Sequence, residues 1–261
     1  MSLHFFDKDR EGMVLRIERS SIHDGSGFRT VVFLKGCPMR CQWCSTPESQ
    51  SFVEETAKDG TVYGTRMTVE QVVREVRKDS LFYFISAGGL TLSGGEILAQ
   101  PEFSLALLKN AKMECFRTAV ETSFIAPWEK IQPMLPYIDT AYVDLKVFDP
   151  KRHKEYCGIS NERILKNLEL TNVVEKKFQL VVRTPLIPGV NDSEEELESI
   201  GRFCAGLRQL HYVELLPYHK LGMATYERLG RPYLLGDVPT PSQEHMEACR
   251  KIVRQYVQDV R

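Results

Sequence analysis

The chain alternates between two kinds of apolar pattern. Short runs rich in Val, Ile, Leu and Phe resemble buried β-strands, and the segments between them space their apolar residues three or four apart, as amphipathic helices do. The pattern predicts strands over residues 13–20, 28–36, 88–96, 116–123, 140–148, 177–189 and 212–222. It predicts helices over residues 68–79, 101–113, 128–138, 161–170 and 193–207, and a carboxyl-terminal helix over about 241–259.

Two of the predicted helices begin with the spacing of a capping box. Thr68 is followed by Gln71, and Ser193 is followed by Glu196. Each hydroxyl can accept a hydrogen bond from the backbone N–H three residues on, while the longer side chain accepts from the backbone of the hydroxyl residue. We therefore expect helices to begin at Thr68 and Ser193.

Strands separated by single helices predict right-handed βαβ units and a mostly parallel sheet. The chain offers six or seven such units, too few for a closed eight-stranded barrel. We therefore expect an α/β fold with a partial, open (β/α)6-type barrel rather than a doubly wound sheet. No linker or low-complexity tract interrupts the sequence, so we expect a single domain over residues 1–261.

The charge balance narrows the classes of partner. The chain has 34 Lys and Arg residues and 35 Asp and Glu residues. These charges nearly cancel, so no strong positive electrostatic field would attract nucleic acid or an anionic membrane. It has no long apolar run, and its polar first residues do not form a secretory signal. We expect a monomeric cytoplasmic protein that binds neither nucleic acid nor membrane.

Three of the seven cysteines lie in one predicted loop over residues 36–46: Cys37, Cys41 and Cys44. Structural zinc sites and ordinary iron–sulfur sites use four protein ligands, so three thiolates leave one metal position open for a small molecule. The alternative is a zinc knuckle completed by a distant residue such as His23 or His219. The other cysteines are single and are expected to be small buried residues: Cys115, Cys157, Cys204 and Cys249.

The cysteine loop resembles the signature of the radical S-adenosylmethionine (SAM) superfamily, C-x3-C-x2-C with an aromatic residue, Trp43, before the last cysteine. The stretch "IHDGSGFRTVVFLKGC" resembles the approach to this loop in glycyl radical enzyme activating enzymes, such as the pyruvate formate-lyase activases. "TLSGGE", "VDLKVFD", "RTPLIPGVND" and "ELLPYHKLG" resemble later motifs of that family, in the same order. The resemblance covers about residues 12–230.

This resemblance implies one [4Fe–4S] cluster on Cys37, Cys41 and Cys44, with SAM bound at the open iron. One electron from the reduced cluster would cleave SAM to methionine and a 5′-deoxyadenosyl radical. In the family, that radical removes the pro-S hydrogen of a backbone glycine in a large glycyl radical enzyme. We therefore expect an oxidoreductase of anaerobic metabolism whose substrate is a protein.

Gly94, Gly95 and Glu96 end a predicted strand, where glycine lets the backbone approach a ligand closely. The resemblance assigns this motif to the ammonium group of SAM. The alternative is a plain turn from a strand into a helix.

Asp144 and Lys146 alternate with apolar neighbours, so both side chains point to one face of a strand. The resemblance assigns the segment, with Leu145 between them, to SAM: Lys146 would meet its carboxylate, and Asp144 a polar group or a nearby cation. The alternative is an internal salt bridge.

The resemblance assigns further positions to SAM. Arg183 would meet its carboxylate or ribose, His219 its adenine, and Trp43 and Ser45, beside Cys44, its adenosyl part. The alternatives are an exposed strand-end arginine and a histidine that is hydrogen-bonded within the fold. The family often has His-Asn after the last cysteine, whereas this chain has Ser45. In this respect it resembles the activases of glycyl radical dehydratases and decarboxylases more than the formate-lyase activases.

Two acidic residues carry further expectations. Glu121 stands where the formate-lyase activases have an aspartate of a monovalent-cation site, so a cation near Glu121 and Asp144 is an open expectation. Asp24, on the "HDGSG" turn, belongs to a loop that in the family lies near the incoming glycyl loop, and it is assigned to partner binding. The alternative for Asp24 is a turn-forming role.

Residues 46–67 contain no cysteine. Many relatives outside the formate-lyase type carry a ferredoxin-like insert with two more cysteine sets at this point. Auxiliary clusters are therefore not expected, and the electron must come from an external donor. The family expectation for that donor is flavodoxin or ferredoxin.

Two other function classes remain open. One is a radical SAM enzyme acting on a small molecule, of the 7-carboxy-7-deazaguanine synthase type, which also has a short barrel and a modified cysteine motif. The other is a zinc-binding interaction module, which would be colourless and would not cleave SAM. The motifs "YVDLKVFD" and "LLPYHKLG" favour the activases over both.

Overall fold

The computed structural model describes residues 6–261, which form two compact units. The boundary passes through the loop of three cysteines and through strand β8 (Thr140–Asp144). The expectation of a single domain over residues 1–261 stays a prediction. The first unit contains the described chain up to Pro38, Glu48–Thr122 and Pro127–Ala141, and the second contains Met39–Pro47, Ser123–Ala126 and Tyr142–Arg261.

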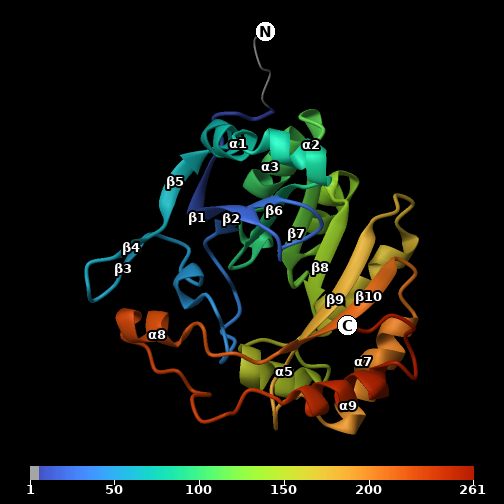
Figure 1. Ribbon diagram of the computed structural model, residues 1–261. Helices are drawn as coiled ribbons and strands as arrows, with labels where there is room; N and C mark the ends of the chain where they lie inside the picture. Colours follow the sequence, from blue (N-terminus) through green and yellow to red (C-terminus); the bar gives the residue numbers. More distant parts are fainter. Residues whose placement is uncertain (1–5) are drawn as a thin grey trace. The chain divides into compact units, whose positions relative to one another are not determined.

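The strands of the first unit lie in the order β7-β6-β2-β1-β5 (Figure 1). The parallel strands are β2 (Arg29–Leu34), β6 (Gly89–Gly94) and β7 (Arg117–Thr122), and β1 (Glu11–Ser21) is antiparallel to β2 and to β5 (Thr65–Thr68). Both faces of β2 and β6 are largely buried, as the apolar run Val31–Leu34 predicts for β2. Leu34 pairs with Gly94, so the cysteine loop and the glycine motif leave the sheet at the same edge.

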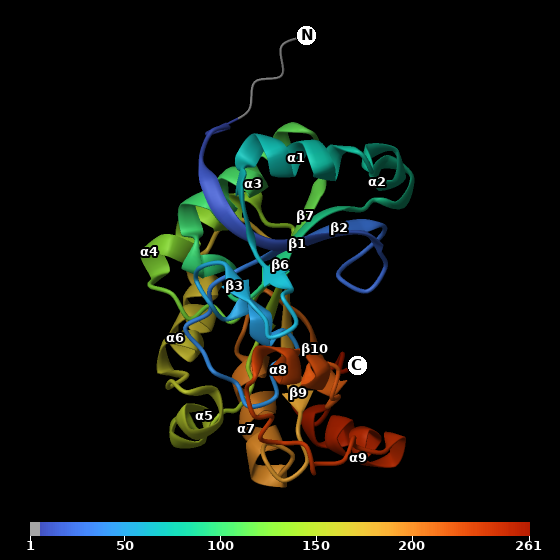
Figure 2. The ribbon, with the colours of Figure 1, turned by 90° about the vertical axis from the view of Figure 1, so that its left-hand side faces the viewer.

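Helices α1 (Val69–Arg77) and α3 (Pro101–Met113) pack against each other, and α3 also contacts β6 and β7 (Figures 1 and 2). The predicted capping box at Thr68 is confirmed, because Thr68 Oγ1 accepts from Gln71 N and Gln71 Oε1 accepts from Thr68 N. The helix predicted over residues 128–138 is instead the short α4 (Trp128–Ile131) and a 3-10 turn to Tyr137. Pro133 and Pro136 lack the N–H donors that a longer α-helix needs.

The second unit contains the end of β8 and two parallel strands, β9 (Gln179–Leu186) and β10 (Leu210–Pro217). Helices α7 and α9 pack against each other, and both contact β10 (Figure 1). The helices of this unit are α5 (Pro150–Cys157), α6 (Glu162–Leu170), α7 (Glu194–Ala205), α8 (Met223–Leu229) and α9 (Gln243–Val253).

The second capping box is only half formed. Ser193 accepts from Glu196 N as predicted, but the Glu196 carboxylate accepts from Phe148 N instead of returning a bond to Ser193. Burial raises the pKa of Glu196. The carboxylate satisfies a backbone donor of the segment that follows β8, so a local motif is overridden by a tertiary contact.

The predicted elements differ from the structure in their ends and in several short additions. Strand β10 ends at Pro217 rather than at residue 222, and α9 ends at Val253, after which Val260 forms an isolated parallel bridge with Val213. The pattern did not predict α2 (Ser80–Ser86), α5, α8, β5 or the hairpin of β3 (Glu55–Thr56) and β4 (Val62–Tyr63).

The expected α/β class, with mostly parallel strands that do not close into a barrel, is confirmed. Within residues 6–261, no helix has the length and apolar character that crossing a membrane requires.

Candidate active site

The cysteine loop leaves β2 with its backbone held in place. Gly36 N donates to Ser49 O at 2.7 Å, and Cys37 N donates to Gln50 O at 3.2 Å. Gly36 has a φ of +95°, in the region that favours glycine. The first cysteine therefore starts from a fixed backbone position at the carboxyl end of a parallel strand.

The glycine motif supports this same backbone. Gly94 has a φ of +115°, and a Cβ on Gly95 would lie 2.5 Å from Gly36 O. Glu96 N donates to Gly36 O at 2.8 Å, while the buried Glu96 carboxylate accepts from Thr122 Oγ1 at 2.5 Å. Gly94 thus permits a close approach to Leu34 at the end of β2, and Gly95 permits one to the start of the cysteine loop. Their assignment to SAM stays a prediction.

The rest of the loop belongs to the second unit and lies against the end of α5. Arg40 N donates to Cys157 O at 2.8 Å, and Gln42 N donates to Tyr156 O at 3.0 Å. Cys44 N donates to Cys41 O at 3.1 Å, which closes a turn between the two cysteines. These bonds hold Cys41 from both sides.

The third cysteine is packed against the segment that follows β10. A Cβ on Gly222 would lie 2.6 Å from Cys44 O and 3.2 Å from the Cα of Ser45. Gly222 has a φ of −74°, so the need for glycine here is one of space and not of backbone conformation. Arg231 Nη1 also donates to Pro47 O at 2.9 Å, which ties the same segment to the end of the loop.

Lys146 and Asp144 form the internal ion pair that was the alternative interpretation. Lys146 Nζ lies 2.5 Å from Asp144 Oδ2, and the Lys146 side chain is only 13% exposed. Burial opposes the charge on Lys146, but the charges of Asp144 and the nearby Cys41 sulfur outweigh it, so the pKa of Lys146 is raised. A fixed positive charge therefore lies close to one of the loop thiols.

The backbone after β8 is held both by β9, since Leu145 N donates to Arg183 O at 2.9 Å, and by side chains. Thr184 Oγ1 donates to Leu145 O at 2.8 Å, Asn191 Nδ2 to Lys146 O at 2.6 Å, and Asn161 Nδ2 to Val147 O at 2.8 Å. Since these polar groups are buried, each bond satisfies a carbonyl that would otherwise lack a partner. The backbone that carries the Lys146 side chain is therefore hydrogen-bonded at three successive carbonyls.

Arg183 is not an exposed strand-end residue. Its Nε donates to Glu214 Oε2 at 2.8 Å, and its guanidinium lies 3.9 Å from the ring centroid of Tyr142. Its side chain is 13% exposed. Arg183 thus forms a second ion pair within the second unit, on the neighbouring strands β9 and β10.

The residues assigned to the adenosyl part of SAM differ in their surroundings. Trp43 is buried, with its ring 6.4 Å from that of Tyr156, and its indole Nε1 has no hydrogen-bond partner among the described residues. Ser45 and His219 are exposed. Of these three residues, Trp43 is therefore the one whose buried N–H group can donate a hydrogen bond to a ligand.

In the first unit, Asp24 and Glu121 are both engaged by hydroxyl groups. Ser21 Oγ donates to the Asp24 carboxylate, and Thr91 Oγ1 donates to Asp24 O at 2.8 Å. Ser93 Oγ donates to Glu121 Oε2 at 2.6 Å. Asp24 therefore has the turn-forming role that was its alternative, and its contact with a partner stays a prediction.

Sequence reasoning missed three contributors to this site: Gly222, Tyr233 and Cys157. Tyr233 Oη lies 2.8 Å from Tyr218 Oη, and burial together with that hydroxyl raises the pKa of Tyr233. The "YHKLG" stretch could have indicated Gly222, because it belongs to a motif already recognised. No local signal marks Cys157, since only the fold brings it to the loop.

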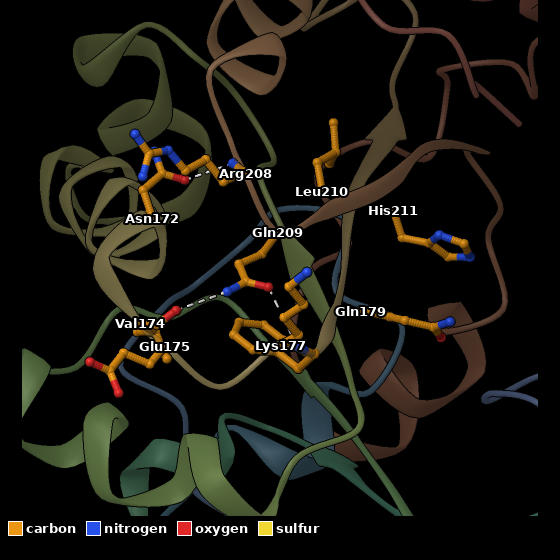
Figure 3. Close-up of a pocket in the computed structure, with 10 residues that line it drawn as sticks. Asn172, Val174, Glu175, Lys177, Gln179, Arg208, Gln209, Leu210 and His211 are labelled. Carbon is orange, nitrogen blue, oxygen red and sulfur yellow. Dashed lines mark hydrogen bonds between the residues drawn. The ribbon is translucent and has the colours of Figure 1, made fainter.

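A separate pocket of about 410 Å³ lies at the amino ends of β9 and β10 (Figure 3). Gln209 Nε2 donates to Val174 O at 3.2 Å, and Arg208 N donates to Asn172 Oδ1 at 2.7 Å. Barrels of parallel strands place their chemistry at the opposite, carboxyl ends. This pocket therefore lies at the opposite end of the strands from the cysteine loop.

The donor set fits an iron–sulfur cluster. Cys37, Cys41 and Cys44 lie in one loop and form no disulfide, and thiolates are the ligands that such clusters use. Within residues 6–261, no three His, Cys, Asp or Glu side chains already converge as a bound ion requires. The ligand assignment therefore rests on the loop spacing, on the donor chemistry and on the comparisons that follow.

Comparison with known proteins identifies the superfamily. The Radical SAM superfamily profile matches residues 31–200. The isethionate sulfite-lyase activating enzyme of Oleidesulfovibrio alaskensis is 39% identical over 291 aligned positions, with 92% of this chain and 94% of that protein covered. Because that alignment is longer than this chain of 261 residues, the relative contains residues that this chain lacks.

Two further comparisons agree. The pyruvate formate-lyase 2-activating enzyme of Escherichia coli is 33% identical, with 94% of this chain and 90% of that protein covered. A crystal structure of a domain of pyruvate-formate lyase-activating enzyme from Bacteroides vulgatus has a TM-score of 0.56 and 31% identity, over 67% of this chain and 98% of that one. Radical SAM proteins of this family use a [4Fe–4S] cluster and SAM, and the chain belongs to the glycyl radical enzyme activating enzymes of the radical SAM superfamily.

Proposed function

We propose that this protein activates a glycyl radical enzyme of the lyase or dehydratase class, with its cluster held by Cys37, Cys41 and Cys44. The cluster, when bound, supplies the electron that cleaves SAM and so provides for removal of a hydrogen atom from a backbone glycine. Relatives named as isethionate sulfite-lyase and (2S)-3-sulfopropanediol dehydratase activating enzymes, at 39% and 34% identity, support this partner class.

The observation that carries the proposal is the support of the cysteine loop. Its entry is held by Gly95 and Glu96 against Gly36, and its end is packed on Gly222. A flexible loop would lose conformational entropy on binding a metal cluster, and a prefixed loop loses less. The backbone therefore favours a resident cluster on these three thiols.

Two ion pairs support the assignment of SAM to the second unit. Lys146–Asp144 and Arg183–Glu214 each place a cation and an anion side by side. A methionyl group is a zwitterion, so its carboxylate can join Lys146 or Arg183 while its ammonium group joins an acidic partner. Trp43 Nε1 offers a buried donor near the third cysteine for the adenosyl part, with Ser45 and His219 completing that part of the proposal.

The first unit adds Gly94, Gly95 and Glu96 to the proposed SAM contacts, and Asp24 to the proposed partner contacts. A monovalent cation near Glu121 and Asp144 also belongs to the proposal. The two carboxylates are the support for this cation. They already accept hydrogen bonds, Glu121 from Ser93 and Asp144 from Lys146. Comparing the rate of SAM cleavage in potassium, sodium and tetramethylammonium buffers tests it, and equal rates would exclude the cation.

The absence of cysteine from residues 46–67 supports an external electron donor of the flavodoxin or ferredoxin type. The near-neutral net charge of −1 fits a partner held by shape and backbone contacts rather than by a strong field. A monomeric cytoplasmic protein is part of the same proposal.

The test uses reduced, reconstituted protein with SAM and a seven-residue peptide of the RVSGYAV type whose glycine carries deuterium at Cα. Deuterium should appear in 5′-deoxyadenosine, and the same peptide with Ala in place of Gly serves as the control. Transfer from a small molecule such as a pterin, with none from any glycyl peptide or partner enzyme, would replace the proposal by a small-molecule reaction.

A further inference from the structure

Cys157 has no role in the reaction proposed above, yet it lies against one of the three loop cysteines. The bonds from Arg40 N to Cys157 O and from Gln42 N to Tyr156 O tie the backbone on both sides of Cys41 to the end of α5. Gly158 continues this contact, since a Cβ there would lie 3.4 Å from Arg40 Cβ. The two cysteines are therefore neighbours by backbone geometry.

Their side chains also interact, because the Cys41 sulfur raises the pKa of the Cys157 thiol. Both side chains are buried, with Cys41 8% exposed and Cys157 fully buried. Both are free thiols in this structure. When no cluster binds Cys41, such a pair of adjacent, buried thiols is a site for disulfide formation.

We propose that Cys41 and Cys157 form a disulfide when the cluster is lost, which gives the protein a reversible oxidised state. The two thiols together release two protons and two electrons as the Sγ–Sγ bond forms. A disulfide oxidant such as glutathione disulfide accepts both and becomes two thiols. A dithiol reductant reverses the reaction and returns Cys41 to the ligand set.

Disulfide and cluster exclude each other, because the Cys41 sulfur cannot bond to iron and to Cys157 at the same time. The oxidised state therefore blocks reassembly of the cluster until the protein is reduced. It also protects Cys41 from oxidation to sulfinic or sulfonic acid, which a thiol reductant does not reverse. This inference needs the three-thiolate cluster but not the identity of the glycyl partner, so it can fail while the proposed function stands.

The experiment starts from holoprotein whose cluster is removed anaerobically by a chelator. The apoprotein is treated with glutathione disulfide, its remaining thiols are alkylated, and it is digested without reductant for mass spectrometry. The expected main product is a cross-linked peptide pair joined through Cys41 and Cys157. Cys41 recovered chiefly in a bond to Cys37 or Cys44, or chiefly alkylated, would overturn the proposal.

Variants add a second readout. Iron uptake by the oxidised wild-type apoprotein should be largely lost without dithiothreitol and restored with it. Cys157→Ala should take up iron without the reductant. Cys204→Ala, the matched control at a cysteine that is also fully buried, should behave as the wild type. Equal loss of iron uptake in Cys157→Ala and the wild type would contradict the proposal. If a variant does not fold, the peptide map of the wild type still tests whether the disulfide forms.

Discussion

Gly222→Ala tests how tightly the cysteine loop is packed against the segment after β10. A Cβ at position 222 would lie 2.6 Å from Cys44 O, and the atoms it meets are backbone atoms of the loop itself. An ordinary contact between carbon and carbonyl oxygen is about 3.3 Å, so either the loop or the helix α8 segment must move by roughly 0.7 Å. Because Gly222 has a negative φ, strain of the backbone does not add to this effect.

The magnitude follows from overpacking. Inserting a methyl group into a packed site costs about 1–3 kcal/mol when the neighbours cannot relax. For a chain of this size, that corresponds to a fall in Tm of roughly 2–10 °C. The displacement falls on the third cysteine of the loop, so we also expect the reconstituted variant to lose its iron faster than the wild type.

The assay compares thermal unfolding of the apoprotein with the rate of iron release to a chelator from the reconstituted protein. Gly236→Ala is the matched control, because it lies in the same segment and a Cβ there would meet its nearest neighbour at 3.9 Å. Both properties should change in Gly222→Ala and neither in Gly236→Ala. Wild-type stability and wild-type iron release in Gly222→Ala would show that the loop is not held by this contact.

Three further predictions use other parts of the chain. Replacing any one of the three loop cysteines by Ala should abolish binding of about four irons per chain, whereas Cys204→Ala should retain them; iron analysis and visible absorption decide. Lys146→Met should weaken SAM binding by about 1–3 kcal/mol, the value of a charge-assisted hydrogen bond, while the exposed Lys151→Met should not; equal Kd values in a SAM titration would refute the role of Lys146. The hydrogen bond from Arg19 lowers the pKa of Asp79, so its contribution is present above the unfolded pKa of about 3.9 and is lost as the pH falls through the lower folded value. Asp79→Asn should therefore be less stable at pH 7, and its difference from the wild type should shrink below about pH 4 in urea unfolding.

Local patterns in the sequence determined much of the fold. The capping box at Thr68 and the apolar stripe of α1 involve residues within one or two turns of a helix, so their spacing alone specifies them. The continuous apolar run Val31–Leu34 likewise specifies β2 as a buried strand. The three-cysteine spacing, together with the ordered motifs around it, predicted the superfamily that the comparisons show.

The partners of individual side chains were decided by the tertiary structure. Glu196 had the spacing of a capping residue, but its carboxylate accepts from Phe148 N, because the fold brings that backbone donor within reach. Cys157 has no local signal at all, and it reaches Cys41 because the end of α5 pairs with the loop backbone. Periodicity reports which face of an element is buried, whereas hydrogen bonds and charges are satisfied by whatever the packed chain brings within reach.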